Sequence, residues 1–184
     1  MQLSDFVIQY FPSALQQVQN LKIEDEVLNV YEIALIYHYT DSGYETVNET
    51  LIQNKGIITT DYERLLNAAL KKLPSYQGVV FRGAVLSKKQ KQRYTDALNT
   101  NSSVPEPFYL STSKSELIAN QFSQGNTLYM IFSKTGKSIE KFAKFGLLSG
   151  QNEKEVLFLP NTPFDVVDIT YTDSKTLLIL EEIL

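Results

Sequence analysis

The hydrophobic pattern of the sequence changes at Pro74, and this change limits the folds that the chain can adopt. Before Pro74, apolar residues recur at helical spacing over residues 24–39 and 44–54. A third stretch opens with Thr60 three residues before Glu63, a spacing typical of a capping box at a helix start. The chain before Pro74 is therefore expected to be helical.

After Pro74 the sequence is rich in strands. Short runs of β-branched and aromatic residues predict strands at residues 79–81, 108–111, 127–132, 155–159, 164–171 and 176–183. Helices are expected among them at 87–98 and 113–122, because each opens with a Ser followed three residues later by Gln or Glu. Gly125-Asn126 is expected to turn the chain after the second of these helices.

A helical half followed by a strand-rich half indicates an α+β fold. A chain of 184 residues is long enough to bury a core and favours one domain. We expect a single domain over residues 1–184, with a helical layer at 1–74 on a two-sheet β core at 75–184.

The composition argues against several classes of function. The chain has no Cys, which excludes a thiolate nucleophile and a Cys metal cluster, and no metal is expected. A net charge of -4 argues against a non-specific nucleic-acid binder. No apolar run is long enough to span a bilayer, and no signal peptide is visible at the N-terminus.

The first cluster that could carry chemistry is Phe81-Arg82-Gly83, at the end of an apolar strand. An Arg held by a strand offers a fixed guanidinium fork for a phosphate, and Gly lets a ligand approach the backbone closely. Taken alone, Arg82 is more typical of a salt bridge at the end of a strand.

The second cluster is Ser111-Thr112-Ser113. On an extended chain Ser111 and Ser113 face one way and Thr112 the other. Ser113 also suits the N-cap of the following helix. The hydroxyl of Ser111 has no such structural use, and it is expected to bond something specific.

The third cluster is Glu153-Lys154-Glu155, directly before an apolar run. Strand geometry would place both carboxylates on one side, although a charged loop beside a strand is the ordinary alternative. Burial is expected at Glu155, where an ionised carboxylate needs a partner. The preceding residues, 142–152, have no period and are expected to form a loop, of which residues 145–152 are expected to be exposed and comparatively mobile.

The order of the three clusters resembles the arginine-specific mono-ADP-ribosyltransferases, a family of bacterial toxins and vertebrate cell-surface enzymes. The resemblance extends to Tyr39-Thr40, Tyr44 and Asn48 in the helical half. It also covers residues 73–83, which resemble the first core strand of the family, and residues 153–158 and 164–166, which resemble its C-terminal pattern. It implies an ADP-ribosyltransferase-type α+β fold. It also implies an enzyme that splits NAD at its nicotinamide–ribose bond and transfers ADP-ribose to an arginine of a target protein.

The resemblance also implies roles for individual residues. Glu155 would stabilise the oxocarbenium-like ribosyl cation, and Glu153 would take a proton from the incoming guanidinium. Ser111 would position Glu155 and the ribose, while Arg82 would bind the pyrophosphate of NAD. The other residues expected to contact NAD, which is a co-substrate here, are Gly83, Thr112, Ser113 and Phe122. Phe122 would stack on nicotinamide, with a core aromatic as the alternative.

One feature departs from the family pattern. Members often carry an aromatic residue shortly before the first Glu of the pair, where this chain has Ser149-Gly150-Gln151-Asn152. The nearest apolar candidates are Phe145, Leu147 and Leu148, so the target protein is not identified. The single histidine, His38, lies in the helical half and is expected to be structural.

Two other functions could use the same residues. One is an NAD glycohydrolase, in which water replaces arginine as the acceptor. The other is an inactive NAD-binding or interaction module, although the joint presence of both carboxylates argues against it. A family member of this kind is expected to be a secreted toxin or effector acting in a target cell, with a cytoplasmic enzyme as the alternative.

Overall fold

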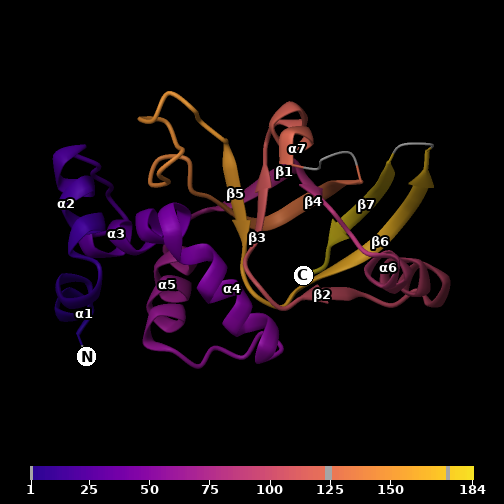
Figure 1. Ribbon diagram of the computed structural model, residues 1–184, viewed down its shortest axis with the longest axis horizontal. Helices are drawn as coiled ribbons and strands as arrows, with labels where there is room; N and C mark the ends of the chain where they lie inside the picture. The colour runs from indigo at the N-terminus through magenta and orange to yellow at the C-terminus, as the bar shows by residue number, and fades with distance from the viewer. Residues whose placement is uncertain (1, 123–125, 173–174) are drawn as a thin grey trace. The chain divides into compact units, whose positions relative to one another are not determined.

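The computed structural model describes residues 2–122, 126–172 and 175–184 (Figure 1). It divides into two compact units. The first comprises Met1–Pro74 and Lys137–Glu155, and the second comprises Ser75–Gly136 and Val156–Leu184. The turn expected at Gly125 lies outside the described residues.

The first unit is built mainly from helices. They are α1 (Leu3–Tyr10), α2 (Pro12–Asn20), α3 (Val30–His38), the π-helix η1 (Tyr39–Gly43), α4 (Tyr44–Gln53) and α5 (Asp61–Lys72). Helix α3 packs against α1, α2 and α5 and is buried from Glu32 to Tyr37. Within the described residues, no helix has both the length and the apolar character needed to cross a membrane.

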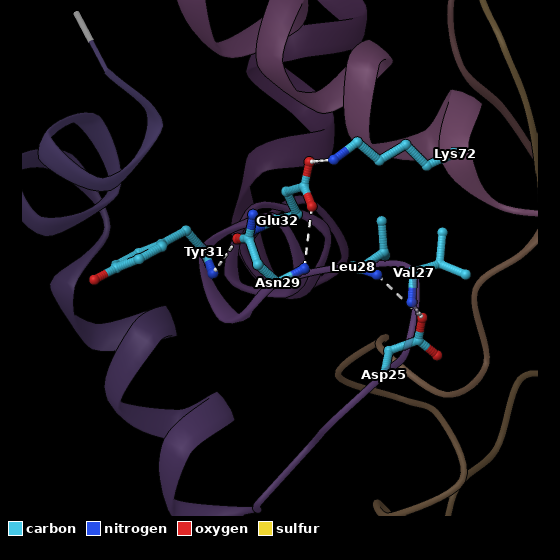
Figure 2. Close-up of polar contacts among 7 residues, drawn as sticks. All are labelled: Asp25, Val27, Leu28, Asn29, Tyr31, Glu32 and Lys72. Atoms are coloured by element: carbon cyan, nitrogen blue, oxygen red, sulfur yellow. Dashed lines mark hydrogen bonds and ion pairs between the residues drawn. The ribbon is translucent and has the colours of Figure 1, made fainter.

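Helix α3 starts later than its periodicity predicts, because two polar side chains turn the chain before it (Figure 2). The Oδ1 atom of Asp25 accepts hydrogen bonds from the backbone N–H groups of Val27 and Leu28 at 2.9 and 3.2 Å. Asn29 and Glu32 then form a reciprocal capping box. The helix expected over 24–39 is therefore wrong at its start, since these side chains compete with helical backbone bonds.

The capping box also ties α3 to another helix of the first unit. The Oε2 atom of Glu32 accepts from the backbone of Asn29 at 3.1 Å, while its Oε1 atom pairs with Nζ of Lys72 at 2.7 Å (Figure 2). Lys72 is the last residue of α5, where a cation also interacts favourably with the helix dipole. The buried Glu32 is thus paired at both carboxylate oxygens.

The capping boxes read from the sequence at Thr60 and Ser87 are confirmed. Thr60 caps α5, and Ser87 caps α6 (Lys88–Thr100) in the second unit. The helix expected at 44–54 corresponds to α4, and Gly56 follows it in a left-handed conformation with φ +78°. Helices α1 and α2 had not been assigned from the sequence.

The strands form one hydrogen-bonded sheet. They are β1 (Ser75–Ala84), β2 (Val104–Glu106), β3 (Leu110–Ser113), β4 (Thr127–Ser138), β5 (Glu155–Phe158), β6 (Thr162–Tyr171) and β7 (Thr176–Glu182), in the order β1-β3-β5-β4-β7-β6-β2. Strand β4 pairs with β5 and β7 and also with β1. The α+β class is confirmed, but these pairings join into one sheet the strands that were expected in two.

Two helices pack on the strands of the second unit. Helix α6 packs on β6 and β2, and α7 (Glu116–Phe122) packs on β1 and β3. The apolar core of this unit includes Val80, Tyr129, Ile131, Val156, Phe158, Phe164, Leu178 and Leu180. Strand β2 was not expected from the sequence, because it contains Pro105, a residue tolerated at the edge of a sheet.

The expected N-cap at Ser113 is wrong. Ser113 is still the last residue of β3, where it is paired with Phe81 of β1. Helix α7 begins at Glu116, and the Oγ atom of Ser113 accepts a hydrogen bond from the backbone N–H of Ser115 at 3.0 Å. Pairing in the sheet keeps Ser113 extended, so the helix starts two residues later than its sequence motif indicates.

Candidate active site

In the second unit, the Arg82 side chain is held against the strand that carries Ser111. Arg82 lies in β1, which is antiparallel to β3, and its side chain is partly buried. Its Nη1 atom donates a hydrogen bond to the carbonyl oxygen of Ser111 at 2.7 Å. A guanidinium carries five N–H donors in a rigid fork, so one such bond can orient it and leave other donors for an anion.

The Ser-Thr-Ser cluster forms the end of β3. The Thr112 side chain is buried, and its Oγ1 atom donates to the carbonyl oxygen of Val156 in β5 at 2.6 Å. Ser111 is partly buried, and its backbone carbonyl oxygen accepts the hydrogen bond from the Arg82 guanidinium. The cluster therefore links β3 both to the Arg82 side chain and to the strand that begins with Glu155.

Glu155 is the first residue of β5 and is 8% exposed, as expected from its place before an apolar run. Its carbonyl oxygen accepts a hydrogen bond from the backbone N–H of Ile139 at 3.0 Å. This bond lies within the first unit and fixes the backbone at the point where β5 begins. A buried carboxylate in such a position is unfavourable without polar partners.

Glu153 occupies a different setting from Glu155. It precedes the strand and is partly buried, and its backbone N–H donates to the carbonyl oxygen of Phe145 at 2.9 Å. Burial raises the pKa of the Glu153 carboxyl above its ordinary value. A carboxylate with a raised pKa is a better proton acceptor, which suits a general base.

Glu153 and Glu155 are not alternate residues of one strand, contrary to the sequence-based expectation, because β5 begins only at Glu155. Lys154, which lies between them, has φ +52°, in the left-handed region that ordinary side chains rarely adopt. Its backbone N–H donates to Oδ1 of Asn152 at 2.8 Å. A local turn therefore sets the relation between Glu153 and Glu155, because Lys154 is not extended.

Tyr44 is close to the carboxylate of Glu153, which sequence reasoning did not predict. Burial, followed by the charges of Glu45 and Glu153, raises the pKa of the Tyr44 phenol. Its hydroxyl donates to Oε1 of Glu45 at 3.2 Å. Tyr44 begins α4, far from Glu153 along the sequence, so only the fold brings the two residues together.

The segment 142–152 has neither helix nor strand, and residues 147–151 are exposed. The expected loop is confirmed. The exposure expected over 145–152 is confirmed at Phe145 and at 147–151, whereas Gly146 is buried and Asn152 is partly buried. The mobility expected of this segment stays a prediction. Leu147 and Leu148 are each 60% exposed, and Phe145 is 37% exposed. The backbone of Phe145, an aromatic residue that lies earlier in the sequence than the family pattern suggests, is hydrogen-bonded to the backbone of Glu153.

The remaining candidates lie in separate places. Phe122 ends α7 and is 57% exposed, so the core-aromatic alternative is wrong. Gly83 lies in β1 directly after Arg82 and is partly buried. His38 ends α3 and stacks on Phe11 with a ring separation of 4.0 Å, and burial lowers its pKa, so its contacts are those of a packing residue.

The chain matches known proteins in both sequence and fold. The family model of the ADP-ribosyltransferase exoenzymes matches residues 16–184. A curated relative is the NAD(+)–protein-arginine ADP-ribosyltransferase Tre1 of Pseudomonas putida, which is 34% identical over 157 residues. That match covers 83% of this chain, and the chain spans 29% of the length of Tre1.

Two solved structures share the fold. Exoenzyme S from Pseudomonas aeruginosa, in complex with human 14-3-3 protein beta and bound to Carba-NAD, is 21% identical and has a TM-score of 0.77. The match covers 98% of this chain and 86% of that one. The ADP-ribosyltransferase Vis, from Vibrio splendidus and in complex with agmatine, is 22% identical with a TM-score of 0.66, covering 95% and 86%.

The family model spans both units and includes the Arg, Ser-Thr-Ser and Glu-x-Glu clusters. The chain belongs to the ADP-ribosyltransferase exoenzyme family.

Proposed function

We propose that this chain is a single catalytic domain that transfers ADP-ribose from NAD to an arginine side chain of a target protein. The observation that carries the proposal is the pair of carboxylates in different settings. Glu155 is buried at the start of β5, and Glu153 is partly buried in the preceding turn with a raised pKa. A pair of this kind suits one group that acts on the sugar and another that acts on the acceptor.

Arg82, Ser111 and Glu155 act on the same NAD molecule in this proposal. The bond from Arg82 to the Ser111 carbonyl orients the guanidinium, whose other donors bind the pyrophosphate. The Gly83 backbone and residues Ser111–Ser113 contact the nicotinamide ribose side. The exposed ring of Phe122 is available to stack on nicotinamide. The Carba-NAD bound to the structurally similar exoenzyme S supports NAD as the co-substrate.

The sugar step breaks the bond between the ribose carbon and the nicotinamide nitrogen. That nitrogen is cationic in NAD, so nicotinamide leaves as a neutral molecule with the bonding electron pair and needs no proton. The positive charge passes to the ribose as an oxocarbenium-like cation, which the Glu155 carboxylate stabilises. The proposal assigns no step to a metal.

The acceptor step forms a bond between the ribose carbon and a guanidinium nitrogen. A guanidinium is protonated at physiological pH and must lose a proton as the bond forms. Glu153 takes this proton, and its raised pKa makes it a stronger base than an ordinary carboxylate. Two comparisons support arginine as the acceptor. Tre1 is named as a protein-arginine ADP-ribosyltransferase, and Vis was solved with agmatine, a guanidino compound.

We also propose a biological setting. The matching family is that of the ADP-ribosyltransferase exoenzymes, a name that denotes enzymes acting outside the cell that makes them. The structure of exoenzyme S was solved in complex with a human protein. This chain is proposed to act as a secreted toxin or effector on a target protein inside another cell. A cell lysate is incubated with the wild-type protein and labelled NAD. Mass spectrometry of the labelled proteins then identifies the arginines that are modified.

The deciding experiment compares Glu155→Gln with wild type. Nicotinamide release from NAD and ADP-ribosylation of agmatine are measured side by side, with the exposed Glu26→Gln as the matched control. Wild type and the control should carry out both reactions, and Glu155→Gln should lose about a hundredfold or more of each. If wild type releases nicotinamide but does not ADP-ribosylate agmatine, the protein is a glycohydrolase. If wild type forms neither product, it is an inactive module.

A further inference from the structure

The turn that separates the two carboxylates is held by an amide side chain. The Oδ1 atom of Asn152 accepts from the backbone N–H of Lys154 at 2.8 Å. Its Nδ2 atom donates to Oε2 of Glu140 at 3.0 Å. One amide therefore fixes the backbone of Lys154 at one end and is itself fixed by Glu140 at the other.

This amide bridge acts on the residue whose conformation relates Glu153 to Glu155. Lys154 has φ +52°, where a residue with a Cβ is unfavourable unless neighbouring bonds hold it. The bond from Asn152 to the Lys154 N–H is a local turn bond of the kind that Asn commonly makes. Loss of this bond would let Lys154 move towards ordinary backbone angles and would turn the flanking carboxylates.

Glu140 is itself anchored on several sides. Its carbonyl oxygen accepts from the N–H of Leu147 at 2.9 Å, and its Oε1 atom accepts from Oγ of Ser138 at 3.4 Å. A Cβ at Gly146 would collide with the same carbonyl oxygen, so the loop packs closely on the Glu140 backbone. The preceding residue, Ile139, bonds the carbonyl of Glu155.

We infer that Glu140 and Asn152 are positioning residues that set the relative direction of the Glu153 and Glu155 carboxylates. The inference rests on the proposed function, since it assigns these carboxylates to one reaction. Neither Glu140 nor Asn152 touches the substrate in this role. Their contribution is orientation, and a small misplacement of reacting groups can cost on the order of a hundredfold in rate.

The chemistry of the bridge allows a rescue test. Asn152→Asp keeps an acceptor for the Lys154 N–H but places a carboxylate against the carboxylate of Glu140. Glu140→Gln keeps one acceptor oxygen for Asn152 and places its amide towards Ser138. In the double variant, the amide introduced at position 140 can donate to the carboxylate introduced at position 152, while its oxygen accepts from Ser138. The matched control is Asn20→Asp, an exposed site in the same unit.

The experiment measures kcat and KM for transfer to agmatine in these four proteins and in wild type. Asn152→Asp should lower kcat by about tenfold or more and leave KM for NAD within about twofold. Glu140→Gln, the double variant and Asn20→Asp should each stay within about threefold of wild type. A kcat unchanged in Asn152→Asp, or equally low in the double variant, would overturn the inference.

A second measurement separates this inference from the proposed function. Amide hydrogen exchange of Lys154 should be slow in wild type and in the double variant, and about tenfold faster in Asn152→Ala. Unchanged exchange in Asn152→Ala would show that Asn152 does not hold the turn, and would overturn the inference whatever the activity. A wild-type protein without either reaction would instead reject the proposed function, and the positioning role with it.

Discussion

The hydroxyl of Thr112 donates a 2.6 Å hydrogen bond to the carbonyl oxygen of Val156, the residue that follows Glu155. Both residues are buried, so this bond joins β3 to β5 inside the second unit. The middle residue of the Ser-Thr-Ser cluster therefore supports the strand that presents a proposed catalytic carboxylate. The Thr112 side chain stabilises the sheet, while the backbone carbonyl of its neighbour Ser111 orients the Arg82 guanidinium.

Replacing Thr112 by Val should destabilise the protein, because the shape is kept while the carbonyl of Val156 loses its side-chain donor. The expected loss is about 1–3 kcal/mol in the free energy of unfolding, measured by chemical denaturation. Thr112→Ser retains the hydroxyl and should lose less. Equal stability of the Val variant and wild type would show that this bond contributes nothing to folding.

Arg82→Lys should weaken NAD binding, because an ammonium cannot both bond the Ser111 carbonyl and present a planar fork to a pyrophosphate. The expected result is an increase of about tenfold or more in KM for NAD. The control is Arg64→Lys, at an exposed residue whose guanidinium pairs with Asp61. A KM for NAD that is the same in both variants would contradict the role of Arg82.

The sequence predicted those features that depend on local chemistry. The helix starts at Thr60 and Ser87 are set by reciprocal bonds between residues three apart, and both are present. The loop at 142–152, which is exposed at 147–151, follows from a lack of period, and the burial of Glu155 follows from the apolar run after it. Each of these depends on a few neighbouring residues, so no knowledge of tertiary contacts was needed.

The features that sequence reasoning missed depend on contacts between distant segments. Ser113 remains extended because it pairs with Phe81, which delays the start of α7. The left-handed Lys154 depends on Asn152, and Asn152 in turn depends on Glu140. The proximity of Tyr44 to Glu153 is another such feature, because it follows from the packing of the first unit. None of these relations has a repeating spacing that a pattern could reveal.

Phe145→Ala should reduce the modification of a protein target while leaving the modification of agmatine nearly unchanged. Phe145 is partly exposed, and its carbonyl oxygen accepts a hydrogen bond from the backbone N–H of Glu153, so we expect a protein bound at the proposed acceptor side to reach its ring. A small acceptor does not need this surface, whereas a protein does. The measurement compares lysate labelling with agmatine labelling. The control is Val85→Ala, at an exposed apolar residue in the second unit.

Glu153→Gln should separate transfer from NAD cleavage. Gln keeps the shape of the side chain but cannot accept a proton, so the guanidinium stays a poor nucleophile while water can still capture the ribosyl cation. Transfer to agmatine should fall about a hundredfold, and nicotinamide release should fall much less. An equal loss of both activities would mean that Glu153 also supports NAD binding or cleavage, and the division of labour would be wrong.

The pH dependence follows from the same residue. Glu153 accepts a proton only when it is ionised, and burial raises its pKa above the ordinary value of 4.5. Transfer to agmatine should therefore decline as pH falls through this raised pKa, at a higher pH than an exposed carboxyl would give. Nicotinamide release to water should not show this transition. The measurement is a pair of pH profiles of kcat/KM for wild type, with agmatine present and absent.

The raised pKa also predicts an effect on stability. The folded protein holds a proton on Glu153 at pH values where the unfolded chain has released it. The stabilising contribution of Glu153 is therefore complete below the unfolded pKa and is lost as pH rises through the folded pKa. At neutral pH the ionised, partly buried carboxylate opposes folding, so Glu153→Gln should be slightly more stable than wild type.

Thermal melts at a series of pH values provide the check. The Glu153→Gln variant should melt about 1–2 °C above wild type at neutral pH, a small shift because the side chain is only partly buried. The difference should shrink as pH falls and disappear well below the ordinary value of 4.5, where the carboxyl is protonated in both states. The Glu26→Gln control should show no such pH-dependent gain, since Glu26 is exposed. A variant that is less stable than wild type at neutral pH would mean that the ionised carboxylate has stabilising partners that outweigh its burial.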